Sequence, residues 1–445
     1  MITQSHSQGD FTAPMFKRFD SHAGPHVLIV PHTRIFDLPA DLADRFDRGD
    51  TDAVALAHAL GATAAGEEAL DAVPEPAPQS LSLNVSSACN LSCTYCYADR
   101  GSFNGRQSKP MGAVVARNAV DRLFAVADPT QPITIGFLGG EPFINRGLVH
   151  DIVAYAEDQA EDRGLDVRFS VTTNATLLTH EDLDLLRNHR FAVTVSIDGN
   201  AAIQNVQRPQ HNGEGSFEAV YRHIRPLLVD PGRAQIAARA TVTSRDLNLE
   251  RRFAAIRDIG FPEVGFAPLR MSPSGGSLTA GEWPAYLDAL IRLSRCELAA
   301  SLTGRTIALT NLAVALKQLH RGASAPYPCG AGGGYFSVSS DGRWYACHRA
   351  VGNADYELGD NQGLQAAKRR HFLEQRHVHA QAECRACWAR YLCSGGCHQE
   401  AAARTRASCD FIRGWLEFCL TAYCELLERC PNYFTSPDSR RERFA

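Results

Sequence analysis

Three cysteines, Cys89, Cys93 and Cys96, lie within eight residues in the segment SSACNLSCTYCYAD. The spacing CxxxCxxC lets one loop surround a compact metal centre. A cubane iron–sulfur cluster has four irons and normally takes four thiolates, so three cysteines leave one iron open to bind another molecule. A Cys₃His zinc site is the alternative, but it needs a fourth ligand nearby, and no histidine lies between His58 and His150. The spacing therefore favours a catalytic iron–sulfur cluster.

A second group of seven cysteines lies in the carboxyl-terminal part of the chain. Their spacing is C-x17-C, followed after a gap by C-x2-C-x5-C-x3-C and then by one more cysteine. CxxC pairs at moderate spacing often bind zinc, so a zinc site is the alternative for this group. Beside a redox centre, so many thiols favour further iron–sulfur clusters. The seven are Cys329, Cys347, Cys384, Cys387, Cys393, Cys397 and Cys409.

The composition limits the class of protein. The 445 residues carry 45 Lys and Arg against 49 Asp and Glu, a formal charge of -4. This balance supplies no field to hold nucleic acid or an anionic membrane, and no apolar stretch approaches the roughly 18 residues that span a bilayer. The first residues lack the pattern of a secretory signal. We therefore expect a cytoplasmic protein whose 14 cysteines serve metal binding or catalysis rather than a disulfide framework.

Six apolar, β-branched runs must position the first cysteine group. Helical patterns separate most of these runs, which predicts βαβ units and a mostly parallel sheet, either open and doubly wound or part of a barrel. In both folds ligands gather at the carboxyl ends of the strands, and Cys89 follows the end of the first run. The expected strands are 81–86, 133–140, 167–174, 192–198, 236–243 and 264–269. The expected helices are 111–127, 147–164, 180–190, 217–230 and 249–260.

A separate unit precedes these repeats, which fill residues 80–275. Residues 1–79 predict an α+β unit with a hairpin at 26–39 and one or two helices at 41–73. The segment VPEPAPQS ends the unit, since three prolines in eight residues suit an extended linker. Its expected role is either recognition of a substrate or packing as a cap on the sheet.

Two parts follow the repeats. Residues 276–325 predict a helical linker, and residues 326–445 predict a cysteine-rich domain. That domain begins with a hairpin at 330–347, where Asp-Gly suits the tight turn, and ends in an amphipathic helix at 411–430. Three cysteines of this helix are expected to pack in the core rather than bind metal. They are Cys419, Cys424 and Cys430.

The first cysteine group resembles the signature of the radical S-adenosylmethionine (SAM) enzymes, through Cys89, Cys93, Tyr95 and Cys96. The resemblance extends along all six repeats and implies a partial (βα)₆ barrel. It also implies that the open iron binds the methionine part of SAM, whose reductive cleavage yields a 5′-deoxyadenosyl radical that abstracts hydrogen. An electron donor such as flavodoxin or ferredoxin is implied as a partner.

The same resemblance assigns ligand contacts to the strand ends. The run from Gly139 to Pro142 resembles the GGEP motif, whose backbone meets the methionine amino group. The alternatives are a plain turn for this motif and a solvated loop residue for the arginine that follows the fourth strand. The expected contacts to SAM are Tyr95 at the adenine, Gly140 and Glu141 at the amino group, Asn174, Ser196 and Asp198 near the ribose, and Arg208 at the carboxylate.

The second cysteine group resembles the seven-cysteine extension called SPASM, found on radical enzymes that modify peptides. The resemblance implies two auxiliary 4Fe-4S clusters with interleaved ligands. By that pattern one cluster is held by Cys384, Cys387, Cys393 and Cys409, and the other by Cys329, Cys347 and Cys397. The fourth position of the latter is either Cys296 or an open iron that can take a substrate thiolate.

Relatives with this extension act mostly on ribosomally made peptides or proteins, so a peptide or small protein is the expected substrate. Sulfatase-maturing members, which oxidise Cys or Ser to formylglycine, carry an aspartate directly after the cysteine that here is Cys347. This chain has His348 there, and its run CHRAVG is closer to thioether-forming peptide maturases. Asp198, Glu141 and His348 are possible bases. Formylglycine formation is the alternative activity, and an electron-transfer protein or a zinc scaffold are alternatives outside this class.

Overall fold

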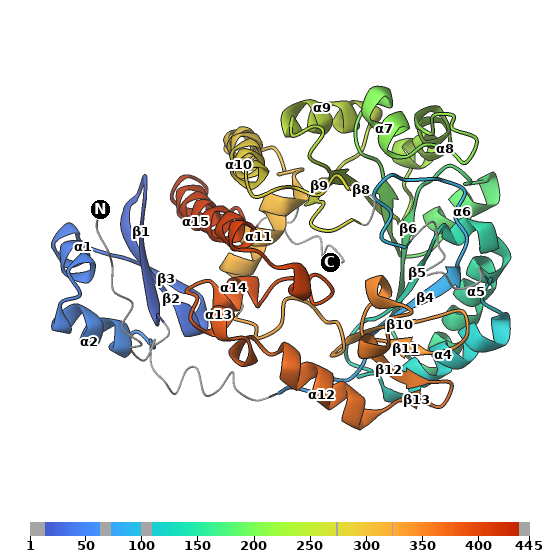
Figure 1. Ribbon diagram of the computed structural model, residues 1–445, viewed down its shortest axis with the longest axis horizontal. Coiled ribbons are helices and arrows are strands. Elements are labelled where there is room, and N and C mark those ends of the chain that lie inside the picture. Colours follow the sequence, from blue (N-terminus) through green and yellow to red (C-terminus); the bar gives the residue numbers. More distant parts are fainter. Residues whose placement is uncertain (1–13, 63–72, 99–108, 273–274, 323, 436–445) are drawn as a thin grey trace.

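The computed structural model describes residues 14–62, 73–98, 109–272, 275–322 and 324–435 (Figure 1). An antiparallel sheet of three strands forms the amino-terminal unit together with two helices. The predicted hairpin at 26–39 is its second and third strands, whereas its first strand was not expected from the sequence. The elements are β1(Phe16–Ser21), β2(Gly24–Ile29), β3(Arg34–Asp37), α1(Ala40–Asp47) and α2(Thr51–Ala59).

A second sheet carries the six predicted parallel strands in sequence order, and each lies within two residues of its expected bounds. Helices cover the outer face of this curved sheet (Figure 1). The strands are β4(Ser80–Ser86), β5(Ile133–Gly139), β6(Val167–Thr173), β7(Phe191–Ser196), β8(Gln235–Val242) and β9(Val264–Pro268). The helices are α4(Ala113–Val126), α5(Arg146–Arg163), α6(His180–Asn188), α7(Ala201–Gln207), α8(Phe217–Val229) and α9(Leu249–Ile259), of which only α7 was not predicted.

The predicted hairpin at 330–347 does not stand apart from the repeats. Its first strand pairs in parallel with β4, so the sheet continues into the cysteine-rich part and has ten strands in all. The fold is thus the expected α/β partial barrel, open at β9 and extended at β4. The added strands are β10(Tyr335–Val338), β11(Trp344–Tyr345), β12(Glu357–Asp360) and β13(Gly363–Leu364).

The carboxyl-terminal part is mostly helical. Its long last helix packs on both helices of the segment between the repeats and the hairpin. Cys419 and Cys424 are buried in this packing, as predicted, and Cys430 lies half-buried just after the helix end. The helices are α10(Glu282–Ser301), α11(Thr310–His320), α12(Ala366–Arg376), α13(Ala382–Arg385), α14(Arg390–Cys393) and α15(Arg406–Arg429).

The amino-terminal unit lies against the carboxyl-terminal part, at the left of Figure 1, and does not cap the parallel strands. Nζ of Lys17 lies 2.7 Å from a carboxylate oxygen of Glu417, and Oγ1 of Thr421 donates to the carbonyl of Asp20 over 3.2 Å. Both partners belong to α15. Among the helices of the described ranges, none is long and apolar enough to cross a membrane.

Candidate functional site

The loop that carries the first three cysteines is held at the carboxyl end of β4 by the segment after α7. The backbone N–H of Ser92 donates to the carbonyl of Pro209 over 2.7 Å, and that of Thr94 donates to the carbonyl of Gln207 over 2.9 Å. Nε2 of His211 lies 2.6 Å from the carbonyl oxygen of Cys89. Burial raises the pKa of Cys89 to about 12, and the nearby charges of Cys93 and Cys96 add to this shift. The three predicted thiols therefore lie together.

The Gly-Gly-Glu-Pro run at the end of β5 contacts the same loop through its backbone. The N–H of Gly140 donates to the carbonyl of Ser86, and the N–H of Glu141 donates to that of Ala88, each over 2.8 Å. A Cβ at Gly140 would lie 2.3 Å from the carbonyl oxygen of Ala88, and Gly139 has a φ of +147°. Both positions require glycine because the two backbones approach too closely for a side chain.

The side chain of Glu141 turns toward the protein. Its carboxylate accepts from Oγ1 of Thr173 and from the backbone N–H of Asn174, each over 2.7 Å, which joins the end of β5 to the end of β6. Burial raises the pKa of Glu141 to about 7, against the lowering effect of these hydrogen bonds. Asn174 in turn donates to the amide oxygen of Asn90 over 2.9 Å, and its Nδ2 lies 3.9 Å from Sγ of Cys89.

The buried carboxylate of Asp198 links Tyr95 to Arg208, and all three residues were predicted to contact the cofactor. Asp198 is fully buried, accepts from the hydroxyl of Tyr95, and lies 3.1 Å from Nε of Arg208. The guanidinium carbon of Arg208 lies 5.2 Å from the centre of the Tyr95 ring. Burial lowers the pKa of Arg208, but the interaction with Asp198 and the charges of Tyr95 and Cys93 together outweigh this effect, and the net shift is upward. This pairing uses Nε, and within the described residues both Nη groups remain without a hydrogen bond.

Ser196, the remaining predicted contact, is half-buried at the end of β7. It lies two residues before Asp198 along the chain. The contacts described above do not single out Glu141 or Asp198 as a general base.

Five cysteines of the carboxyl-terminal part line one cavity of about 470 Å³, among them Cys397, which was predicted for the other auxiliary cluster. Nη1 of Arg404 lies 2.8 Å from Sγ of Cys384 in its wall. Burial raises the pKa of Cys393 to about 11, and the charges of Cys384, Cys387 and Cys409 contribute to this rise. The structure therefore brings together the four residues that were predicted to share a cluster. They are Cys384, Cys387, Cys393 and Cys409.

The three cysteines predicted for the other auxiliary cluster also lie near one another. Burial raises the pKa of Cys347 to about 11, and the charges of Cys397 and Cys329 contribute to this shift. Nη1 of Arg349 lies 3.8 Å from Sγ of Cys397. Cys296, on α10, is exposed, as is Cys329 of this group.

The donor set of each group fits an iron–sulfur cluster. A 4Fe-4S cluster takes its thiolates around four irons rather than at one point, and cysteines that line the wall of a cavity provide this arrangement. Guanidinium groups beside Cys384 and Cys397 balance the negative charge that thiolates bring. In the part of the chain that the structure describes, no three His, Cys, Asp or Glu side chains converge as the ligands of a single metal ion.

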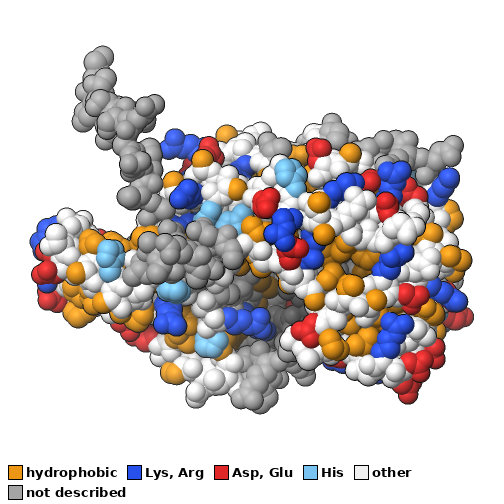
Figure 2. All heavy atoms as spheres, turned by 90° about the horizontal axis from the view of Figure 1, so that it is seen from below, with side chains coloured by type: hydrophobic (Ala, Val, Ile, Leu, Met, Phe, Trp, Pro, Cys, Tyr) orange, Lys and Arg blue, Asp and Glu red, His pale blue; other side chains and the backbone are white. Residues whose placement is uncertain are grey.

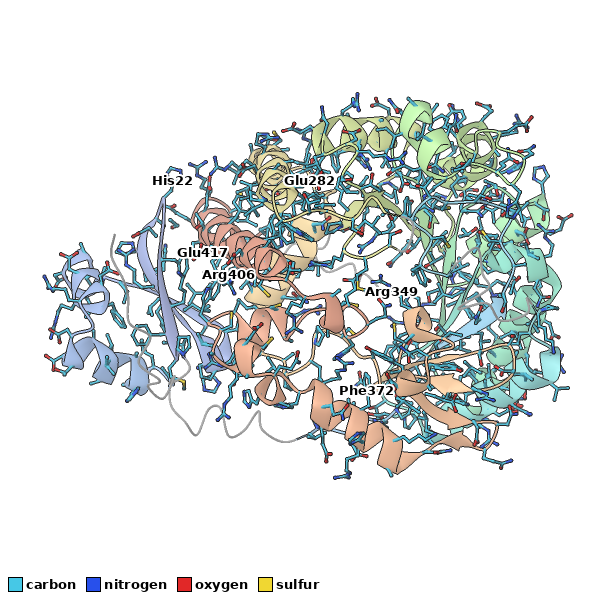
Figure 3. The ribbon with its side chains drawn as sticks, in the orientation of Figure 1. His22, Glu282, Arg349, Phe372, Arg406 and Glu417 are labelled. Atoms are coloured by element: carbon cyan, nitrogen blue, oxygen red, sulfur yellow. The ribbon has the colours of Figure 1, made fainter. Side chains whose placement is uncertain are left out.

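Charged residues that the sequence analysis missed connect the barrel to the cysteine-rich part. Glu400 lies 2.7 Å from Nη1 of Arg349 and 3.2 Å from Nε of Arg270, which follows β9. Figure 3 labels Arg349 on the side of the carboxyl-terminal part that faces the sheet, and Figure 2 shows the surface hollowed near the middle of the molecule. In the sequence, the ion pair of Arg349 with Glu400 is indicated only by the position of Arg349, two residues after Cys347.

His348 lies at the junction of hairpin and barrel. Its Nδ1 lies 2.7 Å from the hydroxyl of Tyr335, which lies 2.8 Å from Oγ of Ser82 on β4. Burial lowers the pKa of His348 to about 4, so the ring is neutral near pH 7. The histidine that replaces the expected aspartate is therefore an uncharged residue in a hydrogen-bonded chain.

Comparison with known proteins gives a family match for part of the chain. Residues 83–227 match the model of the radical SAM superfamily. Over 359 residues the chain is 27% identical to the serine-type anaerobic sulfatase-maturating enzyme of Klebsiella aerogenes, covering 74% of this chain and 82% of that protein. Over 335 residues it is 27% identical to the cysteine-type anaerobic sulfatase-maturating enzyme of Clostridium perfringens strain 13. That match covers 71% of this chain and 87% of that protein.

Two solved structures share the fold. One, described as His6-tagged anSMEcpe with bound AdoMet, has a TM-score of 0.68 at 21% identity and covers 82% of this chain and 100% of the other. The other is SuiB of Streptococcus suis bound to S-adenosylmethionine, with a TM-score of 0.52 at 11% identity. It covers 89% of this chain and 97% of the SuiB chain. At these identities the likeness concerns the fold.

Proposed function

We propose that this chain, whose residues 83–227 are a radical SAM domain, joins a cysteine sulfur to the methylene carbon of an Asp or Glu residue within a small protein. The runs CHRAVG, YLCSGGCHQEA and CDFIRGWLEFCLTAY resemble the maturation protein of quinohemoprotein amine dehydrogenase, so the γ subunit of that enzyme is the proposed substrate. One observation carries the reaction class: a loop of three cysteines follows the carboxyl end of β4 and is held by the backbone N–H groups of Gly140 and Glu141, just after β5.

The residues around this loop are suited to the two cofactors. Cys89, Cys93 and Cys96 would hold a 4Fe-4S cluster through three thiolates, and the backbone of Gly140 lies directly against their loop. When bound, the cluster and SAM supply a radical that abstracts a hydrogen atom from the substrate. The polar groups of Tyr95, Asn174, Ser196, Asp198 and Arg208 would bind and orient SAM from the neighbouring strand ends.

The two remaining cysteine groups would hold the auxiliary clusters. Formation of a carbon–sulfur bond from a carbon-centred radical and a thiolate releases one electron, so an acceptor must lie near the substrate. The hairpin β10–β11 continues the same sheet as β4, which places Cys347 beside the barrel. An electron donor such as flavodoxin or ferredoxin completes the proposed set of partners.

His348 favours thioether formation over formation of formylglycine. Sulfatase-maturing relatives carry an aspartate at this position by the resemblance above, whereas here a neutral ring accepts from or donates to Tyr335. Formylglycine formation stays the second candidate, because the relatives named above are anaerobic sulfatase-maturating enzymes.

The amino-terminal unit is proposed to hold the substrate or its leader. In the sheet order β1-β2-β3 the strand β3 is an edge, and an extended peptide can pair with an edge strand through its backbone. Since β1 contacts α15, the edge at β3 is the one we assign to the peptide.

The decisive experiment is anaerobic incubation of the reconstituted enzyme with SAM, a reductant and the candidate γ-subunit polypeptide. Thioether formation predicts loss of the two hydrogen atoms per crosslink and cysteines that no longer react with an alkylating reagent. An aldehyde in place of the cysteine would instead establish formylglycine formation. Release of 5′-deoxyadenosine in either case separates both activities from a simple electron-transfer protein.

A further inference from the structure

An arginine on the inner face of the barrel takes no part in the site described so far. Arg239 lies in the middle of β8, where buried Ala238 and Ala240 alternate with it and face the outer helices. By register Arg239 lies between Ser196 of β7 and Gly265 of β9. A Cβ at Gly265 would lie 3.3 Å from Nη1 of Arg239, so the guanidinium extends across the glycine.

Arg239 is accessible to solvent, although protein atoms surround much of its side chain. The residue is exposed, and yet desolvation by the surrounding protein atoms lowers the pKa of its guanidinium. We interpret these two properties as those of a side chain that points into a recess. The charges of Arg349 and Glu400 and the phenol of Tyr286 also act on this pKa, which places the recess between the sheet and the carboxyl-terminal part.

The guanidinium of Arg239 is influenced by the charge of Glu400, but among the described residues it is not paired with that carboxylate. Within the described ranges it forms no hydrogen bond and no ion pair, whereas the other cations around the recess have carboxylate partners. Those pairs are Arg208 with Asp198, Arg349 with Glu400, and Arg270 with Glu400. Glu400 is thus already shared between Arg349 and Arg270. An enclosed cation without a partner is costly to stability, so an anionic ligand is the physical reason to retain it.

We propose that Arg239 binds the carboxylate of the substrate residue whose methylene carbon is modified, so that it selects an acidic side chain over its amide. This inference rests on the proposed function, in which the reacting carbon belongs to Asp or Glu. A guanidinium pairs with a carboxylate through two parallel hydrogen bonds and fixes its orientation. The methylene carbon is bonded to that carboxylate, and Ser196, on the neighbouring strand, belongs to the residues assigned to SAM.

The recognition step can be tested without a known substrate. The reconstituted holoenzyme with SAM is treated with phenylglyoxal, and mass spectrometry follows the modification of Arg239. N-acetyl-aspartate methylamide should protect Arg239 at least about fivefold better than the asparagine analogue, because only the former brings a carboxylate. Equal protection by the two probes, or none by either, would overturn the inference. This result does not depend on which covalent product the enzyme makes.

The second test compares the γ-subunit polypeptide with a version in which a crosslinked Asp is replaced by Asn. Wild-type enzyme should crosslink the Asp version about 100-fold faster, the effect of losing one enclosed charge pair. Arg239→Gln should lose most of this preference, Arg239→Lys should keep part of it, and the exposed α8 control Arg222→Gln should match wild type. An Arg239→Gln enzyme that retains the full preference would refute the inference. Wild-type enzyme that yields only an aldehyde refutes the proposed function, while the protection assay still decides the role of Arg239.

Discussion

The backbone N–H of Glu141 donates to the carbonyl oxygen of Ala88 over 2.8 Å, so the end of β5 holds the residue that leads into Cys89. The same glutamate receives hydrogen bonds from the end of β6 through its side chain. One residue thus connects the cysteine loop to two strand ends, and the position of the loop depends on the backbone of the Gly-Gly-Glu-Pro run.

Gly140→Ala should displace the cysteine loop. The new Cβ would lie 2.3 Å from a backbone oxygen that no side-chain rotation can move, and overpacking of this kind costs about 1–3 kcal/mol. We expect reconstituted Gly140→Ala to lose iron from the first cluster and to release little 5′-deoxyadenosine. Gly147→Ala on α5 is the control, since nothing lies within 4 Å of its Cβ. Full iron content in Gly140→Ala would contradict this interpretation of the close approach.

Glu141 predicts a pH dependence of stability. Its folded pKa of about 7 lies above the unfolded value of 4.5, so the folded state binds the proton more tightly. The resulting stabilisation, on the order of 3 kcal/mol, is present below pH 4.5 and is lost as the pH rises through 7. Anaerobic calorimetry between pH 5.5 and 8.5 should give a flatter Tm profile for Glu141→Gln than for wild type or for the exposed control Glu161→Gln. Parallel profiles would exclude Glu141 as the titrating group.

Arg404 should tune the auxiliary cluster near α15. Its guanidinium lies 2.8 Å from Sγ of Cys384. Burial raises the pKa of Cys393 and of Cys409, and the charge of Arg404 offsets part of this rise. A nearby cation favours the reduced, more negative form of a cluster, so Arg404→Gln should shift one reduction potential to more negative values. A redox titration followed by electron paramagnetic resonance measures this shift. The exposed Arg222→Gln on α8 should leave all potentials in place.

Much of the site was predictable because its signals are local. The six parallel strands are continuous apolar runs, and the cysteine groups follow from spacing within short segments. The hairpin shows the limit: the pairing of β10 with β4 joins residues 335–338 to residues 80–83, and a four-residue strand carries no pattern that selects its partner.

The charged residues of the recess were not predictable for a similar reason. Arg239, Glu400 and Arg270 lie on three different segments, and none belongs to a spaced motif. Glu141 was predicted as a cofactor contact through its motif, but only the coordinates reveal that its side chain bonds to the end of β6. Register and side-chain direction, rather than residue type, decide these roles.

Cys296 should be dispensable for the auxiliary clusters. It lies on α10, whereas Cys347 is affected by the charges of Cys329 and Cys397. Cys296→Ala should therefore keep the iron content and the spectra of wild type, and Cys329→Ala should lose iron. Loss of a cluster signal in Cys296→Ala would identify it as the fourth ligand.

Arg208 should bind SAM as well as stabilise Asp198. Arg208→Gln leaves a buried carboxylate without its cation, which costs about 3–5 kcal/mol of unfolding free energy. The double variant Asp198→Asn, Arg208→Gln removes both charges and should recover most of this loss. Equilibrium dialysis should nevertheless find a higher Kd for SAM in both variants than in wild type, because the two Nη groups are missing in each. If the double variant recovers SAM affinity along with stability, Arg208 acts only through Asp198.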